Sequence, residues 1–234
     1  MSASEATVER DEGESAVERV YELVKQMAIT FELRPGGRLN ELAIARKIGV
    51  SRTPLREALN RLTSDGFLTF SPKQGFFRKP LSVKEITDLY ELREKIERGV
   101  ARLAVERATE AQIDALEAFL SESIKATGVS TSDILDLAEQ FHERLAAMTG
   151  NAEIMHALKN LNGRIRFVRW VNMEGRREHT QGEHRAILDA LRKRDADRAE
   201  ALIGGHIMLR QDQIVPAVKD AFARIYMNSE GAED

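Results

Sequence analysis

The chain has 234 residues, 42% of them apolar, which is enough to fill two modest hydrophobic cores, so two domains are expected. It contains no cysteine, which excludes disulfides and thiolate chemistry. No apolar run approaches the roughly 18 residues of a membrane span, and the acidic N-terminus does not resemble a secretory signal. We therefore expect a soluble, cytoplasmic and nucleoid-associated protein with no membrane partner, whose residues 1–14 form a disordered acidic arm.

The net charge of −3 conceals a basic block. From Arg34 to Pro80, ten basic residues accompany three acidic ones, a local charge of +7, so the rest of the chain carries −10. A basic segment in an acidic chain indicates a surface for a polyanion on one domain. Charge alone leaves open a basic surface that is merely solvated.

A helix-turn-helix is predicted within this block, after a first helix over roughly residues 15–31. Asn40 can cap a short helix that ends at Gly49, a residue suited to the left-handed conformation of a helix terminus. Ser51 can cap the next helix, whose first turn accepts Pro54 without losing a hydrogen bond. Two short helices joined by a glycine-containing turn are typical of this motif.

The second helix has the features of a recognition helix. Arg52 and Arg56 lie four residues apart and so share a face, where each guanidinium can contact a guanine edge or a phosphate. Ser51 and Thr53 offer hydroxyls to the DNA backbone. The opposite stripe is apolar and should hold the helix to its domain; it comprises Leu55, Ala58, Leu59 and Leu62.

A β-hairpin is predicted after this helix, because the runs FLTF and FFRKP flank the turn SPKQG. A hairpin in this place is a wing, with Lys73 near its tip and Gly75 allowing close approach to the sugar-phosphate backbone. The alternative is a hairpin that only covers a small core, to which four residues could contribute: Phe67, Leu68, Phe70 and Phe77.

The run from Gly37 to Phe67, GRLNELAIARKIGVSRTPLREALNRLTSDGF, resembles the winged helix-turn-helix of GntR-family bacterial transcription regulators. The resemblance implies double-stranded DNA binding by a homodimer that reads a pseudo-palindromic operator. It places Ser51, Arg52, Thr53 and Arg56 at DNA-contacting positions, and Gln74 and Gly75 at the wing tip.

Residues 81–228 read as an all-α bundle of about six helices, so the fold class is mainly α: a winged helix-turn-helix domain over 15–80 followed by this bundle. Ser82 and Glu85 form a possible capping box, Lys79-Pro80 is the expected linker, and Pro216 should kink or break the last helix. The remaining helices are expected over about 109–126, 133–148, 151–171, 177–194 and 197–227, with a disordered tail over 229–234.

Three histidines are placed as a metal site would require. His184 and His206 are each eleven residues from Asp195, so in an antiparallel hairpin they lie at one level of the bundle, and His142 can project inward beside them. Three imidazoles suit zinc or nickel with positions open for a ligand. A metal-free effector pocket and purely structural histidines remain as alternatives.

The bundle also resembles the ligand-binding domain of the FadR-like subgroup, of the FCD type, through the pieces LREKIE, FHERL, GN and EHRAILDAL and through His206. That resemblance implies a small organic acid effector bound beside a metal held by three histidines and an aspartate. Ala138 stands where the aspartate is usual, which puts metal affinity in doubt; only Glu139 plausibly shares a face with His142. Arg93 matches a pocket-facing arginine, with a surface ion pair to Glu97 as the alternative.

Two further features are open to interpretation. Gly204-Gly205 inside a helix indicates either close approach by a ligand or a neighbouring helix, or a bend. A basic run on one helix is expected to be a solvated or dimer face rather than part of a site; it consists of Arg164, Arg166 and Arg169, followed by Trp170.

These features favour a non-enzymatic, effector-responsive regulator that acts as a repressor. One alternative is a sensor of the metal itself. A zinc-dependent hydrolase is the other, but the chain has no HExxH helix, phosphate-binding glycine loop or cysteine nucleophile, and the basic domain would have no purpose.

Overall fold

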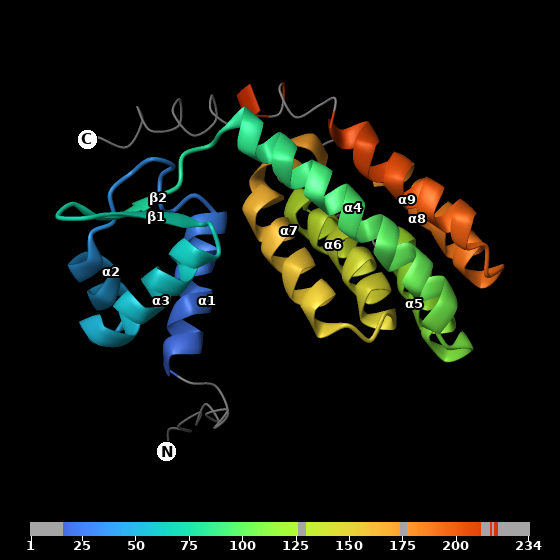
Figure 1. Cartoon of the computed structure of the whole chain (residues 1–234), viewed down its shortest axis with the longest axis horizontal. Coiled ribbons are helices and arrows are strands. Elements are labelled where there is room, and N and C mark those ends of the chain that lie inside the picture. The colour runs from blue at the N-terminus through green and yellow to red at the C-terminus, as the bar shows by residue number, and fades with distance from the viewer. Residues whose placement is uncertain (1–15, 126–129, 174–176, 212–215, 217, 220–234) are drawn as a thin grey trace, which may run out of the picture. The chain divides into compact units, whose positions relative to one another are not determined.

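The computed structural model describes residues 16–125, 130–173, 177–211, 216 and 218–219 (Figure 1). The chain divides into two compact units, residues 1–80 and 81–234. The predicted acidic arm and the C-terminal tail lie outside the described residues. The mainly α fold expected from the sequence, a winged helix-turn-helix followed by a helical bundle, is confirmed.

Within its described residues, 16–80, the first unit contains three helices: α1 (Ala16–Ile29), α2 (Glu41–Ile48) and α3 (Arg52–Ser64). Asn40 caps α2 as predicted, its Oδ1 accepting a hydrogen bond from the Ala43 amide at 3.1 Å, and Gly49 takes the left-handed conformation with φ 70°. Ser51 occupies the N-cap position of α3, but its hydroxyl makes no capping hydrogen bond in the described part of the chain. The predicted side-chain cap is therefore wrong, and the hydroxyl is left exposed.

The wing is a two-stranded antiparallel hairpin of β1 (Leu68–Ser71) and β2 (Gly75–Arg78). Lys73 lies in its turn with φ 67°. Phe67, Leu68 and Phe76 are buried in the core of the first unit. The four apolar residues of the α3 stripe lie in the same core. The core contributions expected from Phe70 and Phe77 are wrong. Phe70 is 47% exposed, although its ring lies tilted against Phe76 with centroids 4.9 Å apart, and Phe77 is only half-buried and outside the core cluster.

The second unit is a bundle with six helices in its described part (Figure 1). They are α4 (Val83–Arg107), α5 (Glu110–Lys125), α6 (Thr131–Met148), α7 (Ala152–Met173), α8 (Arg177–Arg192) and α9 (Ala196–Gln211). The long helix α4 packs along α9 and also contacts α6 and α7. It therefore borders the interior of the bundle on several sides, which is where the buried polar residues gather.

The capping box predicted for α4 is only half formed. Ser82 Oγ accepts a hydrogen bond from the Glu85 amide at 3.4 Å, but the Glu85 carboxylate pairs with Arg164 at 2.6 Å. A complete box caps α6 instead, formed by Ser130 and Asp133. Both helices thus have a serine at the N-cap, but the carboxylate of Glu85 binds α7 instead of completing a box.

The two adjacent glycines of α9 have different surroundings. A Cβ at Gly204 would lie 2.5 Å from the Arg98 guanidinium carbon of α4, whereas one at Gly205 would meet nothing within 4 Å among the described atoms. The flexible Arg98 side chain of the neighbouring helix α4 therefore fills the space beside Gly204. Most of the region around the predicted break at Pro216 lies outside the described residues.

None of the described helices combines the length and apolar character needed to cross a membrane.

Candidate DNA-binding surface and ligand site

The predicted DNA contacts gather on the start of α3 and on the wing. The polar candidates Ser51, Arg52, Thr53, Arg56, Lys73 and Gln74 are all exposed, and Gly75 is half-buried with φ 93°. Arg52 and Gln74, far apart in the chain, line one hollow of about 450 Å³. Arg56 lies 3.8 Å from Glu41, an ion pair that positions its guanidinium beside this hollow.

Arg38 also lines this hollow, although the sequence reasoning did not single it out. It is exposed, and its backbone forms a β-bridge with Phe77 of β2, which fixes it beside the wing. The sequence signal was a basic side chain two residues before the N-cap Asn40. There the positive charge and the positive end of the helix dipole both favour a bound anion. Arg38 therefore joins Arg52 on the surface that is predicted to bind a polyanion.

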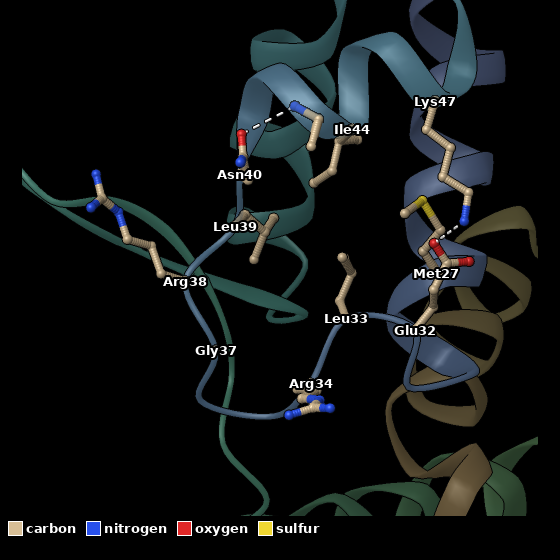
Figure 2. A pocket seen from close by; sticks show the side chains of 11 residues that line it. Met27, Glu32, Leu33, Arg34, Gly37, Arg38, Leu39, Asn40, Ile44 and Lys47 are labelled. Atoms are coloured by element: carbon tan, nitrogen blue, oxygen red, sulfur yellow. Dashed lines mark hydrogen bonds and ion pairs between the residues drawn. The ribbon is translucent and has the colours of Figure 1, made fainter. Parts of the chain in front are cut away.

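A second hollow, of about 390 Å³, lies between α1, α2 and the loop joining them (Figure 2). Met27, Leu33 and Ile44 form its apolar lining, and Lys47 at its edge pairs with Glu32. Arg34 and Arg38 are also on its margin, so the basic surface extends along the α1–α2 loop.

Two arginines of the basic block serve the fold instead. Arg78 is buried and donates to the Phe67 carbonyl at 2.8 Å and the Lys79 carbonyl at 3.2 Å. Arg61 pairs with Glu18 and lies 4.0 Å over the Tyr21 ring. The local charge of +7 therefore overstates the charge that faces outward.

The structure brings the three histidines together inside the bundle. His142 comes from α6, His184 from α8 and His206 from α9, and their side chains are 1%, 3% and 5% exposed. One ring nitrogen of each lies within 4.8 Å of the other two. His184 stacks on Phe141 with ring centroids 3.9 Å apart, which holds its ring in place.

Carboxylates orient two of these rings. Glu97 accepts a hydrogen bond from His142 Nδ1, and Glu183 Oε2 accepts one from His206 Nδ1 at 2.8 Å. Neutral imidazoles held in this way carry the proton on Nδ1 and present Nε2 lone pairs. This arrangement is typical of histidines that bind metal ions.

The two Nε2 atoms of His142 and His206 are 3.2 Å apart. Two lone pairs at that separation repel unless a proton or a cation lies between them. Two nitrogen ligands on a tetrahedral zinc at about 2.0–2.1 Å are roughly 3.3 Å apart. The spacing and the donor type therefore fit a zinc-like ion, with a shared proton as the alternative.

A small cavity of about 20 Å³, lined by Ala138 and His184 among others, lies beside the cluster. That is room for about one water molecule. Glu139 does not supply the missing carboxylate, because its two oxygens go to Arg166 and, at 3.0 Å, to Arg169. Asp136 likewise pairs with Arg166.

Arg93 does pair with Glu97, Nε to Oε1 at 2.5 Å, but the pair is buried, so the alternative of a surface ion pair is wrong. The two residues are 2% and 1% exposed. Glu97 thus accepts from Arg93 through one oxygen and from His142 through the other. Glu97 therefore connects Arg93 directly to His142, a candidate metal ligand.

The basic run of α7 is not a solvated face either. Arg169 is buried, and burial together with the positive charge of Arg93 lowers the pKa of Arg169 to about 10. A buried arginine is costly unless it is paired and hydrogen-bonded. A solvated or dimer face was expected from the sequence because basic runs on helices usually are one, and spacing did not show that Arg169 lies on the same buried side of α7 as Ile165.

Comparison with known proteins agrees with both halves of this description. The family described as "Bacterial regulatory proteins, gntR family" matches residues 16–77, and the family described as "FCD domain" matches residues 88–208. The Nta operon transcriptional regulator of Aminobacter aminovorans is 41% identical over 201 residues, which cover 86% of this chain and 95% of that protein.

More distant proteins have the same organisation. The HTH-type transcriptional repressor RspR of Escherichia coli is 26% identical over 193 residues, covering 81% of this chain and 85% of that protein. The solved structure of E. coli McbR/YncC has a TM-score of 0.69 at 21% identity, over 88% of this chain and 99% of that one, a likeness of fold.

Proposed function

The chain belongs to the GntR family of bacterial regulatory proteins and carries an FCD domain, and from this premise we propose that it is a repressor whose homodimer binds a pseudo-palindromic operator and is released by a small organic acid. Family and relatives are DNA-binding transcription regulators, a non-enzymatic class, so the hydrolase alternative is dropped. The relative RspR is named a transcriptional repressor, which supports repression rather than activation for this chain.

In this proposal the start of α3 enters the major groove. Arg52 and Arg56 contact base edges, the hydroxyls of Ser51 and Thr53 contact phosphates, and the wing places Lys73, Gln74 and Gly75 on the backbone. The exposure of these residues and the hollow shared by Arg52 and Gln74 support the assignment. Arg38 adds a contact near the wing.

The effector site is proposed inside the bundle, and the observation that carries it is the buried chain of contacts Arg93–Glu97–His142–His206–Glu183. His142, His184 and His206 would hold a zinc or nickel ion, which when bound supplies a Lewis-acidic position for a carboxylate. Arg93 pairs with the acid, and Glu97 transmits a change at Arg93 to His142. The acid shifts DNA affinity only by its differential affinity for the two states of the dimer.

A sensor of the metal itself is the second candidate, favoured by the 3.2 Å between two Nε2 atoms, which suits a cation without any acid. The two candidates differ in what releases DNA. The protein is first stripped of metal with a chelator. If it is a metal sensor, zinc alone then changes its affinity for the operator; if it is an acid-responsive regulator, the affinity changes only when an acid is added.

The operator can be obtained by selecting bound duplexes from a randomised DNA library with the purified full-length chain. We expect enriched sequences with an inverted repeat, bound by a dimer in analytical ultracentrifugation. Enrichment of a single half-site, or binding by a monomer, contradicts the proposed mode of DNA recognition.

A further inference from the structure

A large apolar side chain lies on the predicted DNA-binding surface. Leu42, the second residue of α2, is 49% exposed, and among the described residues it is not one of those that form or flank the core of the first unit. It lines the hollow of about 450 Å³ whose lining also includes Arg38, Arg52 and Gln74. A single exposed leucine is ordinary on a protein surface, but the neighbours of this one are the groups proposed to contact DNA.

The backbone on both sides of Leu42 is held in place. Asn40 caps the first turn of α2 through its hydrogen bond from the Ala43 amide, so Leu42 lies inside a capped turn (Figure 2). The backbone of Arg38, four residues earlier, forms its β-bridge with Phe77 of the wing. The main chain that carries Leu42 therefore needs no ordering when DNA binds, and the binding free energy has to fix the side-chain rotamer alone.

The chemistry of the hollow selects one group on DNA. The proposed function places the start of α3, with Arg52, in the major groove, so a side chain that shares the hollow with Arg52 faces the same groove. Thymine is the base whose edge there carries an apolar group, the C5-methyl, and apolar side chains are the usual partners of this methyl. Leu42 has no side-chain donor or acceptor with which to read any other base edge.

We propose that Leu42 is a specificity-determining residue that contacts the C5-methyl group of one thymine in each half-site of the operator. This inference rests on the proposed function, since it assigns one base contact within the DNA surface. Each protomer of the dimer supplies one Leu42, so the thymine occurs twice, at positions related by the symmetry of the inverted repeat. Arg38 and Arg52 flank the contact and hold α2 against the groove through phosphate or a guanine edge.

The test replaces thymine by deoxyuridine, which keeps the base pair and the O4 acceptor and lacks the methyl group. The operator selected from the randomised library is remade with this replacement at each thymine in turn, and its affinity for the full-length chain is measured. At one thymine of a half-site the replacement should weaken binding about fourfold, which corresponds to the ~0.8 kcal/mol of one buried carbon, and about 16-fold when both half-sites are changed. A selected operator without a preferred thymine in its half-sites overturns the proposal.

Variants assign the methyl contact to Leu42 rather than to another apolar group near the groove, such as the methyl of Thr53. In Leu42→Ala the preference for thymine over deoxyuridine at that position should fall from about fourfold to less than about twofold. Leu42→Met, which keeps a long apolar side chain, should retain most of the preference. Leu23→Ala is the matched control, because Leu23 on α1 is 43% exposed and lines neither of the two hollows described above; it should bind both duplexes as the wild type does.

The outcomes separate this inference from the proposed function. If the full-length chain binds its operator but the thymine preference is unchanged in Leu42→Ala, or the methyl group matters at no position, the assignment of Leu42 is overturned and operator binding stands. If the chain selects no operator at all, the proposed function is overturned and the inference falls with it.

Discussion

Glu183 offers the cleanest perturbation of the candidate metal centre. It accepts from His206 Nδ1 at 2.8 Å, and the Glu183→Gln change keeps its size while removing the charge that fixes the His206 tautomer. Glu97 does the same for His142, but it also pairs with the buried Arg93, so its replacement would destabilise the fold as well. The other oxygen of Glu183 pairs with His179, whose side chain is 70% exposed.

The expected effect follows from the burial of the pair. Removal of such an orienting carboxylate typically weakens metal binding about 10–100-fold, which corresponds to ~1.4–2.7 kcal/mol. The Glu183 side chain is 17% exposed, so solvent partly replaces it, and we expect the lower end, about tenfold. The unfolding free energy of the metal-free protein should change by less than about 1 kcal/mol.

Zinc affinity is measured by competition with a chromophoric chelator. His179→Gln is the matched control, because His179 is 70% exposed and contacts the other oxygen of Glu183, Oε1, at 3.2 Å without contacting the cluster. The control should bind zinc as the wild type does. Equal zinc affinity in Glu183→Gln and wild type would refute the argument that this carboxylate orients a metal ligand.

Three further predictions concern other parts of the chain. Ala138→Asp places a carboxylate beside His184, so it should lower the melting temperature of the metal-free protein. Added zinc should then raise the melting temperature of this variant by more than it raises that of the wild type; an equal rise in the two proteins contradicts the prediction. Gly205→Ala should stabilise the fold by up to about 1 kcal/mol in urea unfolding, and Gly204→Ala should gain less, because its Cβ requires the flexible Arg98 guanidinium to move away from Glu94 and Glu200; equal effects contradict the close approach. In mobility-shift titrations across salt, Arg52→Ala should cost about 1–3 kcal/mol on the selected operator and relax its sequence preference, whereas Lys73→Ala should weaken binding to all sequences and reduce the salt slope by about 1; if neither change alters binding, the assignment of the DNA surface is wrong.

Local chemistry explains why the DNA-binding unit could be predicted closely. Asn40, Gly49 and Pro54 each act within one turn of their own position, so caps and turns are readable from the sequence. The hydroxyl of Ser51 shows the limit, because a suitable residue at the N-cap position need not make the hydrogen bond. Which aromatic of the wing is buried depends on where the hairpin meets α3, and that is a tertiary fact.

The ligand site was predictable only in part. Counting from Asp195 placed His184 and His206 at one level because antiparallel helices have a regular rise, and the ring centroids are 4.9 Å apart. The burial of Glu97 and Arg169 follows from packing between α4, α6 and α7, which no spacing along one helix reveals. Arg93 illustrates the difference: its partner Glu97 could be named from i+4 spacing, but the burial of the pair could not.

The central claim is that an acid bound in the bundle controls DNA binding. The direct measurement is the fluorescence anisotropy of the selected operator with wild type and Arg93→Met, titrated with a panel of mono-, di- and tricarboxylic acids, after circular dichroism has shown that both chains are folded. We predict that at least one acid weakens operator binding by the wild type about 5–150-fold, the range of ordinary allosteric coupling, and leaves Arg93→Met within twofold. No response to any acid, or an equal response of the two proteins, would contradict the account.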